Sequence, residues 1–338
     1  MSSTVIYFEA QRDLKRQVFA FTVVAVLVVL FLFTGITSVP VVTVQHSKQN
    51  YAVASELSGK WVMTPFGQRL KSEVITVPTG SIVLSNGKVL EPNGQLLNVR
   101  GANSNQLISS RTQPVPAGSS WVEYAEYNYC GGFFSPGGFG CFSGNWIVPN
   151  TPGFYDGQII YLFIGLQPSG SSPPIIQPVL QYGFCGYQGW QLASWYAYSS
   201  TDYFHSPFYN IPAGTSIAGI LKGIDFHNAG YGEWTSCFMY QKGLGSFCTV
   251  AQLSYQSHSA MKDLKFTSAF VTLEAYINGA MLTNPSLFPS SSPTVFNSLT
   301  EENQHGTYLS PGWKAYQCVS GSPFSVIVNS SNKITLYY

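Results

Sequence analysis

The stretch that decides the fold begins with NWIVPNTPGFYDGQIIYLFIGLQP (Asn145–Pro168) and continues with IIQPVLQYG (Ile175–Gly183), GWQLASWYAYSS (Gly189–Ser200) and SPFYNIPAGTSIAGILKGID (Ser206–Asp225). Each apolar run is short, rich in Ile, Val, Tyr, Phe and Trp, and bounded by Pro, Gly, Asn or Ser. This pattern is typical of successive β-strands joined by turns. The run Gln158–Leu166 is apolar on both faces and predicts a central strand buried between two sheets.

Two of these runs alternate, so each presents a polar side chain on one face of the sheet. In Ile175–Tyr182 the amides Gln177 and Gln181 point to the same side, and in Trp190–Tyr198 Gln191 shares a face with Trp195. A face lined by amides and indoles favours a groove for a polar, extended ligand, although a half-exposed outer face would give the same pattern. The residues predicted to line the groove are Gln177, Gln181, Gln191, Trp195 and Trp146.

The composition is typical of an extracellular β-protein. The 338 residues carry a formal net charge of +1, only 9% are charged and 15% are aromatic. The near-zero charge gives no electrostatic reason to expect a nucleic-acid partner. A surface poor in charge and rich in Tyr, Ser and Asn suits contact with carbohydrate or protein, or self-association.

The six cysteines form an even set with no metal-ligand spacing, so we expect disulfides, an oxidising compartment, and neither a metal site nor a cofactor. Fifteen pairings are possible in principle. The first choice joins the local neighbours Cys130 with Cys141 and Cys237 with Cys248, and leaves Cys185 with Cys318 as the long closure. Asn329 opens the sequon Asn-Ser-Ser and is a predicted glycosylation site.

The N-terminal region predicts a membrane anchor. Residues 18–39 are uncharged and apolar, long enough as a helix to span a bilayer, and Arg12, Lys15 and Arg16 precede them. Basic residues on that side place residues 1–17 in the cytosol and the rest in the lumen or outside the cell, as a single-pass type II protein. The alternative is a secreted protein whose signal peptide is cleaved.

The rest of the chain divides into a stalk (residues 40–56), a small β region with a linker (57–117) and a main domain (118–338). Asn-Gly within Ser85–Lys88 predicts a hairpin. Further strands are expected at Trp121–Asn128, Trp234–Val250, Thr267–Tyr276 and Phe324–Tyr338, and a long surface loop at Leu282–Thr307. Many short strands predict an all-β fold, a two-sheet antiparallel sandwich of jelly-roll or concanavalin-like type.

The order SGNWIVP, IIQPVLQYG, SWYAYSS and IPAGTSIAG over residues 145–224 resembles the glutamic peptidase (eqolisin) family. The resemblance implies a concanavalin-like sandwich in which a carboxyl group activates water and donates a proton, while a Gln amide stabilises the oxyanion. On this alignment Gln177 matches the catalytic Gln, and Trp195 and Tyr196 match the aromatic pair before the catalytic Glu. The Glu position itself falls on Ala197, which can do neither job.

Other acidic residues offer weaker alternatives. A carboxylate from another strand, such as Glu123, Glu126 or Asp202, could replace the missing Glu, although Glu123 and Glu126 should lie on opposite strand faces. Jelly-roll glycosidases need two carboxylates, and their alternating acidic strand is absent. Two small clusters, Asp225 with His227 and Asp202 with His205, could serve acid–base or metal chemistry.

The sequence therefore predicts a membrane-anchored β-sandwich, preferably non-catalytic, that binds carbohydrate or protein or forms a surface layer. The alternative is a divergent glutamic-type acid endopeptidase that works in an acidic compartment, or a glycosidase. A carboxylate within hydrogen-bonding reach of the Gln177 amide would favour the enzyme.

Overall fold

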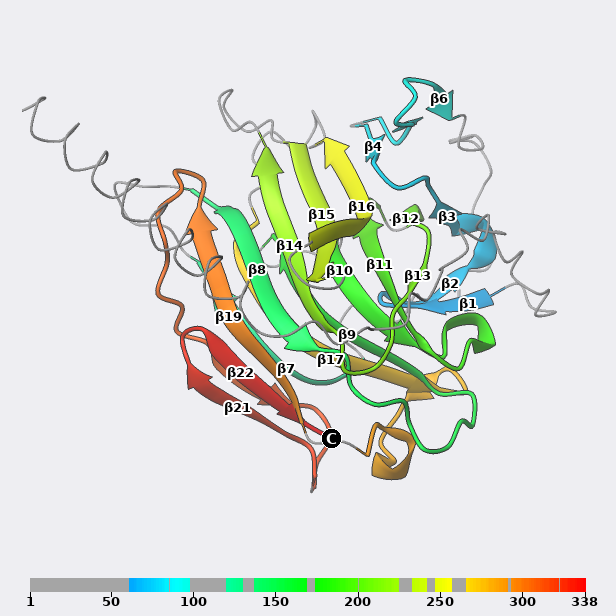
Figure 1. Cartoon of the computed structure of the whole chain (residues 1–338), viewed down its shortest axis with the longest axis vertical. Coiled ribbons are helices and arrows are strands. Elements are labelled where there is room, and N and C mark those ends of the chain that lie inside the picture. Colours follow the sequence, from blue (N-terminus) through cyan, green and yellow to red (C-terminus); the bar gives the residue numbers. More distant parts are fainter. Residues whose placement is uncertain are drawn as a thin grey trace, which may run out of the picture. The chain divides into compact units, whose positions relative to one another are not determined.

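The computed structural model describes residues 61–84, 86–97, 120–129, 137–168, 174–199, 201–224, 233–241, 247–256, 266–290, 293–321 and 323–338. These residues form two large sheets and one small hairpin (Figure 1). No helix within these ranges combines the length and apolar character that a membrane crossing requires. The predicted anchor, residues 18–39, lies outside the described residues, as do residues 1–17 and 40–56.

Sheet one has β9 at its centre, as the doubly apolar run predicts. Its order is β20 (Lys314–Gln317), β7 (Trp121–Asn128), β17 (Ser268–Ile277), β9 (Ile159–Gln167), β10 (Ile175–Tyr182), β11 (Trp190–Ala197), β12 (Tyr203–His205) and β3 (Val74–Thr76). Two short strands pair beside this path, β13 (Tyr209–Asn210) with β11 and β18 (Ala280–Met281) with β17. Short 3₁₀ turns occur at Lys71–Glu73, Phe184–Gly186 and Pro285–Leu287.

Sheet two is built from the strands that remain. Its order is β21 (Ser325–Ser330), β22 (Lys333–Tyr337), β19 (Thr294–Asn303), β8 (Phe139–Ile147), β14 (Ser216–Ile224), β15 (Glu233–Gln241), β16 (Phe247–Gln256), β4 (Ser81–Val83), β5 (Val89–Leu90) and β6 (Leu96–Leu97). β14 and β15 contact β10, so the two sheets stack (Figure 1). The pairs are antiparallel except β12 with β3 and β16 with β4, which are parallel. The predicted all-β sandwich is thus confirmed.

The main core fills the space between the sheets, where alternate residues of each strand point inward. Leu162 and Ile164 from sheet one belong to the same fully buried cluster as Phe238 and Phe296 from sheet two. Gly183, directly after β10, must be glycine: its φ is 78°, and a Cβ there would lie 2.0 Å from the carbonyl oxygen of Gln158. The turn after LQY is therefore fixed by backbone sterics.

One predicted loop is a strand instead. Leu282–Thr307 contains β19, in which Thr294, Phe296, Leu299 and Glu301 are buried while the residues between them are at least partly exposed. Polar residues on the open face hid the period-2 pattern, and a register shift near Ser298 interrupts it. The predicted Asn-Gly hairpin is confirmed, since the Leu84 amide donates to the Lys88 carbonyl at 2.7 Å and Gly87 has φ 77°.

The predicted disulfides do not form among the described residues. Cys141, Cys185, Cys237, Cys248 and Cys318 are free thiols, and Cys130 lies outside the described ranges. Cys248 opposes Tyr240, three residues from Cys237, about 10 Å along the strand, whereas a disulfide needs Cα atoms within about 7 Å. Cys185 follows β10 and Cys318 follows β20, four strands away and about 19 Å at normal spacing.

A buried acid in β7 predicts an unusual dependence of stability on pH. Glu123 opposes Leu273, is fully buried, and burial raises its pKa to about 9, with the Ser325 backbone lowering it in part. Because the folded pKa exceeds the unfolded value, stability is complete below the unfolded pKa and falls as pH rises towards the folded one. We expect Glu123→Gln to reduce the loss of unfolding free energy with rising pH by about 1.4 kcal/mol per pH unit.

Urea unfolding at several pH values between about 5 and 9 measures this slope. Glu301, whose pKa burial raises to about 8, and Glu274, whose pKa burial raises well above its usual range, leave a residual slope in the variant. Equal slopes for the wild type and the variant would show that Glu123 is ionised in the folded protein.

Candidate active site on the outer face of sheet one

Sheet one has a second apolar layer on the side away from sheet two, which we call the outer face. On β10 and β11 the alternate residues Gln177, Val179 and Gln181 and Ala193 and Trp195 point to this side. The sequence pattern predicted these shared faces. The same layer receives Tyr161, Phe163, Phe270, Tyr276 and Trp121 from β9, β17 and β7.

One row of side chains crosses the middle of the outer face. In the strand register Gln181 opposes Tyr161, and Tyr161 opposes Glu274 on its other side. Beyond Glu274 the row continues to Trp121, and beyond Gln181 to Gln191. Two strand spacings, about 10 Å, separate the backbones that carry the amide of Gln181 and the carboxyl of Glu274. An amide and an acid thus flank a single tyrosine.

Glu274 is a buried carboxyl group that favours the neutral form. It is 1% exposed, and Oε1 accepts a hydrogen bond from the hydroxyl of Tyr276. Burial raises the pKa of Glu274 well above its usual range, and the Tyr276 hydroxyl, the Arg69 guanidinium and the Trp121 indole lower it only in part. Perturbed acids of this kind cluster at functional sites.

The amide of Gln181 is oriented by Trp195. The indole Nε1–H donates to Gln181 Oε1 at 3.1 Å, so the NH₂ group faces the opposite way. Gln181 is fully buried, and among the described residues its Nε2 has no hydrogen-bond partner. A buried donor without a partner costs about 1–3 kcal/mol and is rare in native proteins. The side chain is therefore held as a ready donor on the row that contains Glu274.

Gln177 lies on the same face but outside this row. It is fully buried, neither amide atom has a partner among the described residues, and it opposes Trp195. A Cβ built on Gly165 would lie 3.3 Å from Gln177 Cγ, which places the amide over that glycine. Four residues separate Gln177 from Gln181, about 13 Å along the strand. The amide that shares a row with Glu274 is thus that of Gln181 and not that of Gln177.

The other predicted groove residues divide between two places. Gln191 continues the row and donates from Nε2 to Asn210 Oδ1 at 2.9 Å. Trp146, by contrast, lies between the sheets, fully buried against Phe238 and Phe296. β8 belongs to sheet two, and Trp146 points inward with Ile217, its partner in the register. It cannot reach the outer face.

The acidic candidates from the sequence do not meet the amides. Glu123 and Glu126 point to opposite faces, as predicted, because Glu123 opposes core residue Leu273 while Glu126 opposes Phe270 of the outer face. Glu126 opposes Lys314 and lies three strand spacings from Gln177. Asp202 accepts hydrogen bonds from Ser199 and Thr201 and closes a local turn.

His205 belongs to no acid–base cluster with Asp202. Its ring nitrogens contact Thr76 Oγ1 at 3.0 Å and the Ser206 carbonyl at 2.7 Å. Burial lowers the pKa of His205 to about 4, so the ring is neutral near pH 7. Asp225 and His227 lie outside the described residues, within which no group of His, Cys, Asp and Glu could hold a metal ion.

Sequence reasoning missed Glu274, although it predicted the strand that carries it. The signal was present: Glu274 is the single charged residue in SAFVTLEAYI, an otherwise apolar strand. A lone acid in a buried strand is a candidate functional group, because burying a carboxyl without a purpose destabilises the fold. Its position beside Tyr161 and Gln181 follows from strand pairing, which the local pattern does not reveal.

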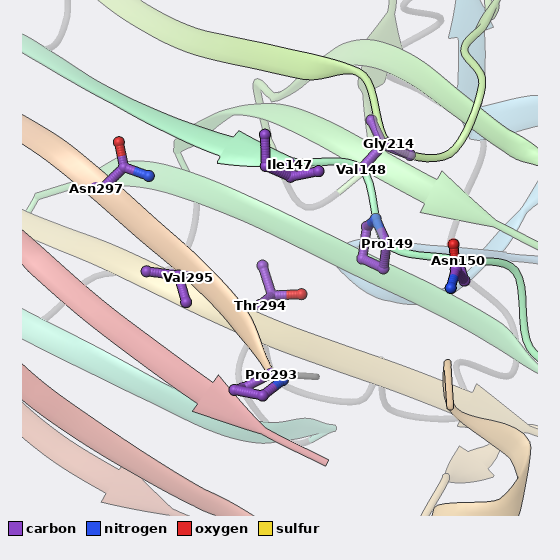
Figure 2. Close-up of a pocket in the computed structure, with 9 residues that line it drawn as sticks. All are labelled: Ile147, Val148, Pro149, Asn150, Gly214, Pro293, Thr294, Val295 and Asn297. Carbon is purple, nitrogen blue, oxygen red and sulfur yellow. The ribbon is translucent and has the colours of Figure 1, made fainter. Parts of the chain in front are cut away.

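Two surface hollows lined by described residues lie elsewhere. Figure 2 shows one of them, about 280 Å³, at the end of β8 and the start of β19, with Val148, Pro149, Thr294 and Asn297 in its wall. Its lining has no acidic, basic, His or Cys side chain. A second hollow beside Trp190 and Asn210 is equally free of such groups. Neither offers acid–base chemistry, so the outer face of sheet one is the candidate site.

Comparison with solved structures finds the scytalido-glutamic peptidase. Its crystal structure with a peptide-based transition-state analogue is 15% identical in sequence, with a TM-score of 0.44, and the match covers 65% of this chain and 98% of that one. A second structure of the same peptidase, with a transition-state analogue inhibitor, gives 14% identity and a TM-score of 0.42 over the same shares. No family model matches the chain, and no curated protein does. Both matches agree with a partial resemblance to glutamic peptidases.

Proposed function

We propose that this chain is a glutamic-type acid peptidase in which Glu274 is the acid–base group and the Gln181 amide stabilises the oxyanion. One observation carries the proposal: an oriented, unpartnered Gln181 NH₂ and a buried Glu274 carboxyl flank Tyr161 on one face. The sequence prefers a non-catalytic role because Ala197 stands at the expected Glu position. Glu274, two strand spacings from Gln181 on the same face, supports the enzyme alternative.

The chemistry needs only these groups and water. Glu274 as carboxylate takes a proton from water while the water oxygen bonds to the peptide carbonyl carbon. The carbonyl oxygen becomes an oxyanion, to which the Gln181 NH₂ donates. Glu274 then returns its proton to the peptide nitrogen, the C–N bond breaks, and a carboxylic acid and an amine leave. Water that enters the site reduces the desolvation that raises the pKa of Glu274, which allows the carboxylate to form.

The surroundings of the site fit this assignment. Trp195 fixes the amide, and Tyr276 holds one oxygen of the acid, so both groups are positioned before substrate arrives. The Tyr161 hydroxyl lies between them and can hydrogen-bond to a substrate carbonyl. Burial raises the pKa of Tyr161 well above its usual range, so it acts as a neutral donor.

We also propose that residues 18–39 anchor the protein in a membrane, with the sandwich in the lumen or outside the cell. The uncharged run and the preceding basic residues support this placement, and cleavage of the segment as a signal peptide is the alternative. Asn329, in β21, is exposed and accessible for the predicted glycosylation. Self-association through the charge-poor surface stays a prediction.

Incubation of the full chain with a denatured protein between about pH 2 and 7 tests the function, with products identified by mass spectrometry. An acidic optimum is what the resemblance to glutamic peptidases implies, and it requires that water entering the open site lower the pKa of Glu274 towards its usual range. The matched control is Glu126→Gln, which removes a half-buried carboxyl from the same face and should cleave at the wild-type rate. No cleavage by the wild type at any pH would overturn the proposal and favour a binding protein.

A further inference from the structure

The β1–β2 hairpin, β1 (Trp61–Thr64) and β2 (Gly67–Leu70), packs on the outer face of sheet one. It pairs with no other strand among the described residues. Its turn is defined locally: Thr64 Oγ1 donates to the Gly67 carbonyl at 2.8 Å and accepts from the Phe66 amide at 3.1 Å, while Gly67 has φ 83°. The outer face therefore holds it through side chains and the Met63 backbone carbonyl.

The hairpin places a peptide carbonyl in the middle of the proposed site. The hydroxyl of Tyr161 donates to the Met63 carbonyl oxygen at 3.1 Å. Tyr161 is the residue that Gln181 and Glu274 flank in the strand register. The Met63 peptide thus lies where a substrate peptide must lie for the acid and the amide to act on it. The carbonyl bonds to Tyr161 while Gln181 Nε2 stays unpartnered, so the peptide is bound but not activated.

Phe66, at the hairpin turn, fills an aromatic pocket beside the site. Its side chain is 1% exposed, stacks on Tyr203 with ring centroids 5.5 Å apart, and meets Trp195 edge-on at 6.1 Å. Phe184 packs on the same indole at 5.7 Å. The pocket is contiguous with the chemistry, because Trp195 also holds the Gln181 amide. An aromatic ring in this pocket is therefore held at a fixed position relative to the Gln181 amide.

Arg69 gives the hairpin a buried positive charge near the site. It is 6% exposed, its guanidinium lies 4.8 Å from the centre of the Tyr203 ring, and its charge lowers the pKa of Glu274. An arginine buried to this extent is normally paired: its Nη1 donates to the Gln68 carbonyl at 3.0 Å, and its charge favours the ionised form of Glu274. The hairpin thus interacts with three parts of the site. The charge of Arg69 acts on Glu274, the Met63 carbonyl accepts from Tyr161, and Phe66 packs in the aromatic pocket.

We infer that the β1–β2 hairpin occupies the substrate-binding face as an internal substrate analogue, and that the Phe66 pocket binds a large aromatic side chain of a polypeptide substrate. The inference rests on the proposed function. It assigns the substrate class as an extended polypeptide with an aromatic residue near the cleaved bond. The inference also means that substrate must displace the hairpin from the outer face. The full chain should therefore cleave more slowly than the same site would with the hairpin displaced.

The test compares full-chain variants in the cleavage assay. Phe66→Ala empties the aromatic pocket, and we expect at least about a tenfold rise in kcat/KM, since a bound state that competes with substrate is weakened. Gln68→Ala, an exposed residue of the same hairpin, is the matched control and should leave the rate unchanged. Gly67→Ala strains the turn without removing a contact of Phe66 or Met63 and should raise the rate as well.

Two further readouts separate this inference from the proposed function. Hydrogen exchange in residues 61–70 of Glu274→Gln should accelerate when a phenylalanine-containing peptide is added, and not with the same peptide carrying aspartate in place of phenylalanine. Products of Phe66→Ala should have an aromatic residue at a fixed distance from the cut. Wild-type cleavage with unchanged rates in both Phe66→Ala and Gly67→Ala would overturn the inference and leave the peptidase standing. If the two peptides changed hydrogen exchange in residues 61–70 equally, the inference would be overturned even if no variant cleaved a substrate.

Discussion

Glu274→Gln is expected to lower the rate of acid peptide cleavage by about a thousandfold, within the range for loss of a general acid–base group. The substitution keeps the shape of the side chain and an oxygen that can accept from the Tyr276 hydroxyl. It removes the proton transfer to and from water and the leaving nitrogen. Because the step lost belongs to the transition state, kcat should fall with kcat/KM, and KM should change little.

The stability of this variant provides the control. Glu274 favours the neutral form in the folded protein, so a neutral amide should unfold at a similar urea concentration in acid. Above about pH 5 the variant should become more stable than the wild type, because the wild type must keep a carboxyl protonated that the unfolded chain releases. A folded Glu274→Gln protein that cleaves at the wild-type rate would show that another group does the acid–base work.

Gln181→Ala is expected to lower kcat by about a hundredfold to a thousandfold, the usual loss for one oxyanion donor. The amide is already oriented by Trp195 and carries an unpartnered NH₂, so no reorganisation is needed when charge develops on the substrate oxygen. Gln177→Ala is the matched comparison. It removes the same chemical group from the same strand face but about 13 Å further along, and should cost much less.

Steady-state kinetics on one peptide, with each variant checked by thermal unfolding, measures the difference. Gln177 was the family-based candidate, because its local sequence matched the catalytic Gln. A larger loss of kcat for Gln177→Ala than for Gln181→Ala would therefore restore that alignment and displace Gln181 from the oxyanion role.

The strands of sheet one could be predicted because their chemistry is local. Period-2 alternation in Ile175–Tyr182 assigns Gln177 and Gln181 to one face, and the structure places both there. Turn residues such as Gly183 and Gly87 mark strand ends through their backbone geometry. The stack of two sheets follows from strands that each need one or two faces covered.

The site could not be predicted, because it depends on which strands become neighbours. β17 lies about a hundred residues after β9 in the chain, yet their pairing sets Glu274 beside Tyr161. A local alignment instead sought the acid on Ala197, next to Trp195, where the structure has none. The position of the β1–β2 hairpin could not be predicted either, since nothing in Trp61–Leu70 indicates that it packs on Tyr161 and Trp195.

A double-mutant cycle between Gln181 and Glu274 tests most directly whether the two groups act on one transition state. Residues that act as a unit are strongly non-additive. The account predicts that Gln181→Ala combined with Glu274→Gln cleaves no more slowly than Glu274→Gln alone, within about threefold. Losses that multiply to the product of the single effects would show that the amide and the acid work independently, and would contradict a shared site on the outer face of sheet one.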